Sequence, residues 1–198
     1  RSFTPENVVE YQNFLGSDIA MPLDDCPPAH ADESRLKAAL LRTRNWALRS
    51  LQARDDLLRE GRLSVRLHLF GIHQGGCNVR LRLQSLQEIQ DLPFDGIAAG
   101  GLSVGESRDE FRATLESLAG GLDNARPRYL MGVGTIPDFL LSVSAGFDMF
   151  DCVLPTRNAR NGQALTMEGP LNIRNARFSQ DRRPLDETCA CRACRSYS

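Results

Sequence analysis

Three cysteines near the end of the chain have the spacing of a metal site. Cys189, Cys191 and Cys194 form a CxCxxC array, and this short spacing lets three thiolates converge on one ion. A structural zinc site takes four ligands, and the chain's three histidines are all distant in sequence. The array therefore predicts a structural Zn²⁺ site whose fourth ligand comes from beyond Ser198, from a fold-back of one of these histidines or from solvent. Three free thiols are the alternative.

Asp151 interrupts an otherwise apolar stretch, MFDCVLP. A carboxylate in such a strand must be paired, hydrogen-bonded or functional, because burial disfavours its charged form. A carboxylate can also attack an anomeric carbon and form a covalent glycosyl intermediate, as retaining glycosyl transfer requires. Asp151 is therefore a candidate nucleophile, and the alternative is a structural carboxylate bonded to Arg157.

Polar or glycine-rich clusters follow nearly every strand that the sequence predicts. In a parallel α/β barrel all strands point the same way, so these clusters would converge on the rim that carries the active site. A helix cap or tight turn explains one such cluster alone, whereas several in register favour a site. The clusters are residues 24–26, 74–76, 100–102 and 132–135, with Asp151 in the last strand.

Short apolar runs alternate with longer amphipathic ones, which indicates repeated βα units around a parallel sheet. Such units fit an open doubly wound sheet or part of a (β/α)₈ TIM barrel, and the length favours part of a barrel. The predicted strands are residues 18–23, 65–72, 96–100, 128–133 and 148–154. The predicted helices are residues 33–60, 78–90, 107–118 and 137–145.

The pattern changes at Gln163. The segment QALTMEGPLNIRN reads as two short strand-like pieces around a Gly169-Pro170 turn signal, and a polar stretch then leads to the cysteines. We therefore predict two domains. Residues 1–162 would belong to the barrel, and residues 163–198 to a β-hairpin insertion and the start of a zinc-binding subdomain.

Composition is that of a globular protein, with 41% hydrophobic and 25% charged residues. No apolar run approaches the roughly 18 residues of a membrane helix, and no secretory signal is visible, so we expect a cytoplasmic protein. A net charge of −1 gives no global reason to expect nucleic acid. Residues 157–198 nevertheless carry eight arginines against four acidic residues, which fits a solvated surface or a phosphate track.

His73 precedes Gln74 and invites interpretation as a general base. Strand alternation points neighbouring side chains to opposite faces of a sheet. If Gln74 faces the site, His73 therefore faces the helices and takes no part in catalysis.

The ordered segments resemble the tRNA-guanine transglycosylase family from Phe3 to Ser198. The matching pieces are TPENVVEYQNFLGSDIAM, LDDCPP, LFGIHQGG, GGLSVGE, PRYLMGVG, MFDCVLPTRNARNG, LNIRNA and CACRACRSYS. The resemblance implies a TIM barrel, of which this chain holds about the last five βα units, with a zinc-binding subdomain. It also implies a homodimeric enzyme of queuosine biosynthesis that exchanges guanine at the tRNA wobble position for a deazaguanine.

The resemblance also implies roles for particular residues. Asp151 would displace guanine and hold the ribose covalently until the new base attacks. Asp24, Gln74 and the backbone of Gly101 and Leu102 would hydrogen-bond the edge of the base, Met131 would cover its face, and Glu106 and Gly132 would line the same pocket. Arg157 and Arg160 would approach the RNA, and Cys189, Cys191 and Cys194 would supply three of the four zinc ligands.

Pocket volume should select the incoming base. Cys26 and Val104 resemble the bacterial pattern, in which the small base preQ1 (7-aminomethyl-7-deazaguanine) is used, whereas enzymes that take bulkier queuine tend to have glycine at the latter position. The resemblance therefore predicts preQ1 as the incoming base.

The resemblance makes this chain an incomplete, C-terminal portion, because family members carry a preceding segment and a downstream histidine ligand. The isolated portion is expected to be inactive, and to be poorly stable or to associate, since a half barrel exposes sheet edges and core. One alternative is a noncatalytic tRNA-binding or scaffolding subunit, against which the retention of Asp151, Asp24 and Gln74 argues. The other is an unrelated barrel enzyme with glycine clusters as phosphate cradles, which leaves the cysteines without a role.

Overall fold

The computed structural model describes residues 3–63 and 67–196. Its contacts divide the chain into two compact units, residues 1–151 and 152–198. This boundary places helix α6 (Leu154–Arg160) in the second unit, although the sequence assigned that segment to the barrel. The division into domains 1–162 and 163–198 stays a prediction. No helix among the described residues is both long and apolar enough to cross a membrane.

The first unit contains a curled, five-stranded parallel sheet with the strand order β1-β2-β3-β4-β5. A doubly wound sheet reverses its strand order at a switch point, whereas this order follows the sequence without reversal. The sheet is therefore half of a (β/α) barrel, which confirms the predicted fold class. The strands are β1 (Ile19–Ala20), β2 (His68–His73), β3 (Gly96–Ala99), β4 (Arg128–Leu130) and β5 (Met149–Phe150).

Each strand lies where the sequence predicts one, although residues 65 and 66 of the second predicted strand lie outside the described residues. The last prediction, 148–154, is too long, because β5 ends at Phe150 and α6 begins at Leu154. Pro155 lies in the first turn of α6, where its missing N–H costs no hydrogen bond. The apolar run therefore contains a strand end, a turn and a helix start.

The predicted helices are all present, and polar side chains cap their first turns. They are α2 (Glu33–Arg59), α3 (Val79–Gln90), α4 (Arg108–Leu118) and α5 (Ile136–Ser144). The capping box of Ser107 and Glu110 is confirmed. Helix α1 (Pro5–Phe14) was missed, although Thr4 forms a second capping box and Pro5 lies in the first turn.

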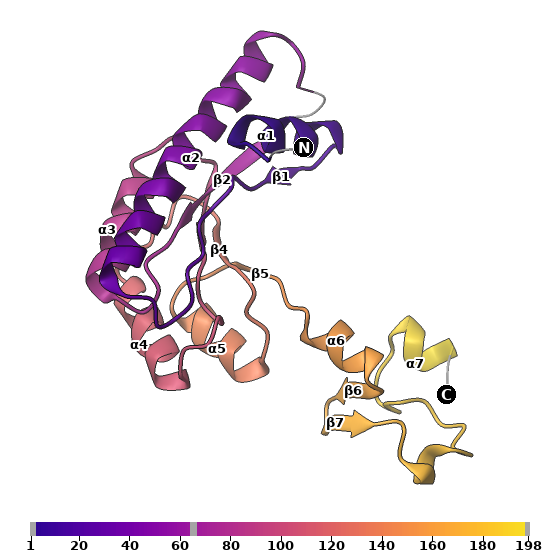
Figure 1. The fold of residues 1–198 in the computed structure, drawn as a ribbon. Coiled ribbons are helices and arrows are strands. Elements are labelled where there is room, and N and C mark those ends of the chain that lie inside the picture. Colours follow the sequence, from indigo (N-terminus) through magenta and orange to yellow (C-terminus); the bar gives the residue numbers. More distant parts are fainter. Residues whose placement is uncertain (1–2, 64–66, 197–198) are drawn as a thin grey trace. The chain divides into compact units, whose positions relative to one another are not determined.

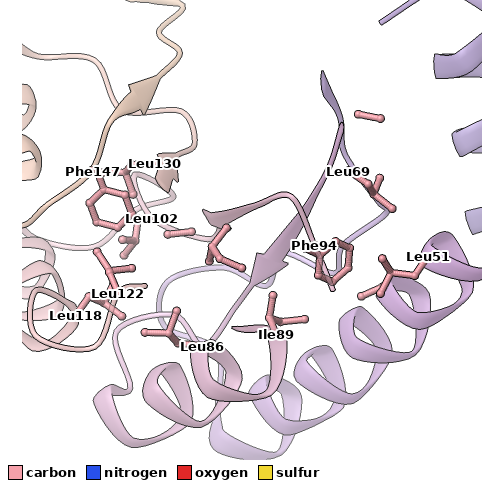
Figure 2. Packing of buried hydrophobic residues seen from close by; sticks show 14 of the residues in the cluster. Leu51, Leu69, Leu86, Ile89, Phe94, Leu102, Leu118, Leu122, Leu130 and Phe147 are labelled. Atoms are coloured by element: carbon pink, nitrogen blue, oxygen red, sulfur yellow. The ribbon is translucent and has the colours of Figure 1, made fainter. Parts of the chain in front are cut away.

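Helices α2 to α5 form a layer on one side of the sheet, and neighbouring helices contact each other in chain order (Figure 1). The core lies between these helices and the strands, where Leu51, Leu69 and Phe94 pack together with Ile89 (Figure 2). Gly71 of β2 faces this layer, because a Cβ atom there would lie 2.6 Å from the Ile89 side chain. The opposite face of β2 is thus the inner face of the half barrel.

The second unit is an antiparallel hairpin with short helices around it. Strands β6 (Gln163–Thr166) and β7 (Gly169–Asn172) pair as the two predicted strand-like pieces, but Gly169 and Pro170 begin β7 instead of forming the turn. The 3₁₀ helix η1 (Ala176–Phe178) and helix α7 (Arg192–Ser196) follow. None of α6, η1 and α7 contains a buried residue. So small a unit with so little core normally needs a disulfide or a metal for stability.

Candidate active site

Asp24 and Gln74 meet at the carboxyl ends of β1 and β2. Gln74 is fully buried and its Nε2 donates a hydrogen bond to Asp24 Oδ2 at 2.5 Å. Gly100, directly after β3, completes this corner, because a Cβ atom there would lie 2.6 Å from Gln74 Nε2 and 3.4 Å from Asp24 Oδ2. The ends of three neighbouring strands therefore form one polar corner.

Gly101 lies against the other end of the Gln74 amide. Its φ of +69° is left-handed, and a Cβ atom there would overlap Gln74 Oε1. Gln74 Oε1 is buried and has no hydrogen-bond partner among the described residues. Because buried acceptors are nearly always satisfied, this oxygen has an acceptor position open to a bound water or to a donor of a ligand.

The two consecutive aspartates after β1 have different environments. Burial raises the pKa of Asp24, although the hydrogen bond from Gln74 partly opposes that shift. Hydrogen bonds from Arg35 and Arg42 lower the pKa of Asp25, the bond from Arg35 most. Asp25 is therefore tied to helix α2, whereas Asp24 is left for the polar corner.

His73 lies on the other face of β2 from Gln74. It shares the helix-side face with Gly71, two residues earlier, and both of its ring nitrogens are buried without a hydrogen-bond partner among the described residues. Burial, and secondarily the charge of Arg82, holds the pKa of His73 well below its ordinary value. His73 is therefore a neutral core residue, as strand alternation predicted.

Asp151 directly follows β5 and is anchored through one oxygen. Tyr129 Oη and the backbone N–H of Gly132 each donate to Asp151 Oδ1 at 2.7 Å. Oδ2 has no hydrogen-bond partner among the described residues. The expectation of a buried carboxylate is wrong, because Asp151 is exposed: the strand ends one residue earlier. Its carboxylate is thus fixed in place, with one oxygen accessible to a substrate.

Tyr129 was not among the residues that the sequence indicated. Burial, and secondarily its bond to Asp151, raises the pKa of its hydroxyl above the ordinary value. The hydroxyl therefore stays protonated and remains a donor to Asp151. Tyrosine within a short strand resembles an ordinary, partly buried packing residue, so the sequence carried no signal for this contact.

The loop after β3 is organised by Glu106. Its carboxylate accepts hydrogen bonds from the backbone N–H groups of Ser103 and Val104, and Ser103 has a left-handed φ of 59°. Leu102 buries its side chain in the core and leaves only its backbone for a ligand. Through these two contacts Glu106 shapes the loop after β3.

The expected site residues therefore form two groups. Asp24 and Gln74 contact each other and abut Gly101, while Asp151 contacts Gly132. Met131, half-buried, lies between the groups along the chain, and its N–H donates to Ala99 O at 3.1 Å. Both groups occupy the carboxyl edge of the same parallel sheet, which is where barrel enzymes bind their substrates.

The second unit carries the remaining candidates. Arg157 and Arg160 are both exposed in the last turn of α6. The Sγ atoms of Cys189, Cys191 and Cys194 lie within 4.8 Å of one another. A hydrogen bond from the N–H of Cys194 is the main cause that lowers the pKa of Cys191. These thiols would supply three of the four ligands of a structural zinc site, or ligands for another thiophilic ion.

A singly wound parallel sheet with polar or glycine-rich residues after its strands defines a protein of the (β/α)-barrel class, whose members bind their ligands at this edge of the sheet. Within that class, the family model described as "Queuine tRNA-ribosyltransferase" matches residues 1–198, so the chain belongs to that family.

Curated relatives of this family are similar over almost the whole chain. A queuine tRNA-ribosyltransferase of Leptospira biflexa is 50% identical over 99% of this chain and 51% of that protein. Those of Sphingopyxis alaskensis and Zymomonas mobilis are 49% and 47% identical over 98% of this chain, and over 51% and 50% of their own lengths. The chain therefore spans about half the length of the curated relatives that it matches.

Proposed function

We propose that the protein carrying this chain is a tRNA-guanine transglycosylase, which replaces guanine at the tRNA wobble position by preQ1. The main support is the carboxylate of Asp151, fixed through Oδ1 with Oδ2 accessible. It lies at the same sheet edge as the buried polar corner of Asp24 and Gln74. The relatives' names state that they act on tRNA, and a tRNA substrate supports a cytoplasmic location.

In the proposed reaction, Asp151 Oδ2 attacks the anomeric carbon of the ribose. The bond from that carbon to guanine breaks, guanine leaves with the electron pair and takes up a proton, and an ester links Asp151 to the RNA. The incoming base then attacks the same carbon, loses its proton and releases the carboxylate. Two inversions retain the configuration at the sugar, as in other double displacements.

Base recognition is assigned to the polar corner. The edge of guanine carries N–H donors, for which Asp24 offers a carboxylate and Gln74 offers the unsatisfied Oε1. The backbone of Gly101 and Leu102 would contact the same base, and Met131 would cover its face, while Glu106 and Gly132 hold the loop and Asp151. A base with a different edge would leave buried groups unpaired, which is how such sites discriminate.

The RNA contacts and the choice of incoming base are assigned to exposed side chains. Arg157 and Arg160 are exposed neighbours on α6 and suit contact with phosphates. Cys26 and Val104 follow β1 and β3 at the recognition edge, and both side chains are exposed. Their match to the bacterial pattern supports preQ1. The family resemblance also supports a homodimer.

Labelled guanine tests the proposed function. The natural-length protein is incubated with tRNA and labelled guanine, and label entering the RNA supports base exchange. Tight tRNA binding without label would instead support a noncatalytic subunit.

We propose structural zinc at Cys189, Cys191 and Cys194, because the three thiols converge and the second unit has little core of its own. Zinc would supply the cross-link that the short helices lack. Cys191→Ser is expected to lower zinc content from about one ion per chain to near zero and to increase proteolysis after residue 151. Metal analysis and limited proteolysis measure both effects. Cys152→Ser is the matched control, because Cys152 is not part of the cluster, and equal zinc in both variants would contradict the proposal.

Asp24→Asn is expected to separate stability from guanine recognition. Burial raises the pKa of Asp24 in the folded state, so the fold favours its protonated form. That form contributes fully to stability below the ordinary pKa of 3.8, and the contribution is lost as pH rises through the raised pKa. A neutral asparagine avoids that loss and still accepts from Gln74. The variant should therefore melt at the same or a higher temperature than wild type at pH 7. Its KM for guanine should rise about tenfold.

Asp25→Asn is the control for that experiment, with the opposite sign. Because Arg35 and Arg42 lower the pKa of Asp25, its contribution to stability is present above its ordinary pKa and lost as pH falls through the lowered one. This variant should melt below wild type at pH 7. Thermal melts between pH 3 and 8 compare the two variants, and parallel pH dependences would contradict the assignment.

A further inference from the structure

Arg82, the fourth residue of α3, is a fully buried arginine whose hydrogen bonds within the described part of the chain all go to backbone carbonyls. Its Nη1 donates to Gly100 O at 2.6 Å and His73 O at 3.3 Å. Its Nε and Nη2 donate to Gly76 O at 3.1 and 2.8 Å, and Nη2 also reaches Gly101 O at 3.3 Å. No carboxylate forms a salt bridge with it among residues 3–63 and 67–196. One side chain thus joins the loops that follow β2 and β3.

This contact set needs a guanidinium group. Arginine presents five N–H donors in a rigid plane, whereas lysine presents three donors on one atom. Burial lowers the pKa of Arg82 to about 10, so the group keeps its charge at neutral pH. A buried cation without a carboxylate is costly unless fixed dipoles surround it. Here the strand-end carbonyls provide those dipoles, and in return their positions are fixed.

The loops held by Arg82 carry the polar corner. Gln74 lies between His73 and Gly76 in the chain, and Gly101 abuts its side-chain amide. Helix α3 approaches the first loop so closely that a Cβ atom at Gly75 would lie 2.7 Å from the backbone N of Arg82. One turn further along α3, Ser85 Oγ accepts the backbone N–H of Gln74 at 3.1 Å. Helix α3 therefore sets the position of Gln74 through two side chains.

We propose that Arg82 is a positioning residue for base recognition: by binding the carbonyls of Gly100, Gly101 and Gly76, it sets the distance between Gln74 and the loop after β3. It touches no reacting atom. The inference rests on the proposed function and adds a residue that acts through Gln74 and Gly101.

Arg126 offers a matched control for a purely structural role. It also binds backbone carbonyls, those of Gln90 at 2.7 Å, Leu92 at 3.1 Å and Phe94 at 3.4 Å. These carbonyls precede β3, so they lie at the amino edge of the sheet, away from Asp24 and Asp151. Loss of either arginine should lower stability, but only Arg82 should alter base recognition.

Arg82→Lys and Arg126→Lys are compared in the natural-length protein, with labelled guanine and tRNA as substrates. Both variants should melt below wild type. Arg82→Lys should raise KM for guanine about tenfold and leave KM for tRNA within about twofold, because one or two of its carbonyl contacts are lost. Arg126→Lys should leave both KM values near wild type. A structural role alone would lower the active fraction, and hence kcat, without changing KM for guanine.

Ser85→Ala keeps the test decisive if Arg82→Lys does not fold. It removes one oxygen from α3 and should raise KM for guanine about threefold to tenfold with little change in KM for tRNA. If Arg82→Lys folds, an unchanged KM for guanine in that variant would overturn the inference. If only Ser85→Ala folds, an unchanged KM in Ser85→Ala would do the same. If wild type incorporates no guanine, the proposed function fails instead.

Discussion

Asp151→Asn is expected to abolish guanine exchange in the natural-length protein, with a loss of about ten-thousand-fold or more in kcat. Asparagine keeps an Oδ1 that can accept the hydrogen bonds of Tyr129 and Gly132, so the side chain should stay in place. It replaces the accessible Oδ2 by an amide nitrogen, which is a poor nucleophile towards the ribose. Binding of tRNA should remain within about threefold of wild type, since the removed charge makes no attractive contact with phosphate.

The measurement is a denaturing gel of the protein after incubation with labelled tRNA. Wild type should give a protein–RNA adduct that resists denaturation, and Asp151→Asn should give none. Asp148→Asn is the matched control, because Asp148 precedes the same strand at its amino end and pairs with Arg128. Its loss should weaken a surface contact and leave the adduct. An adduct that survives Asp151→Asn would place the nucleophile on another residue.

The sequence predicts the sheet of this protein well, because periodicity and capping are local properties. Apolar runs locate all five strands, and Ser107 with Glu110 marks the start of α4. The error at residues 151–154 has a physical cause: apart from Asp151, MFDCVLP is apolar, and apolar character alone does not separate a strand from a turn and a helix start. Pro155 carried the missing signal.

The contacts of the site are less predictable, because they depend on three-dimensional neighbours. Strand-end position identifies Asp24, Gln74 and Asp151, but nothing local says that Tyr129 would donate to Asp151. Arg82 lies on an amphipathic helix, where arginine normally faces solvent, so its burial follows only from the carbonyls around it. The sequence pattern therefore finds residues that face a ligand, and it misses the residues that hold those side chains in position.

The close approach of Gly101 to Gln74 predicts a large effect of a Gly101 substitution on guanine binding. Gly101→Ala is expected to raise KM for guanine at least about one-hundred-fold, because the substitution acts mainly on base recognition. The added Cβ would overlap Gln74 Oε1. Gln74 can yield only by leaving its bond to Asp24, because the side chain is fully buried. The collision therefore displaces the amide that is proposed to bind guanine.

Gly16→Ala separates this collision from simple backbone strain. Gly16 has a φ of +73°, close to the +69° of Gly101, but a Cβ atom there would meet nothing within 4 Å. Gly16→Ala should lower the free energy of unfolding by about 1–2 kcal/mol, the cost of a left-handed alanine, and Gly101→Ala should lower it by at least as much. Only Gly101→Ala should change KM for guanine. Equal KM values in the two variants would show that the contact between Gly101 and Gln74 does not shape the base site, and recognition would then have to lie with other residues of that sheet edge.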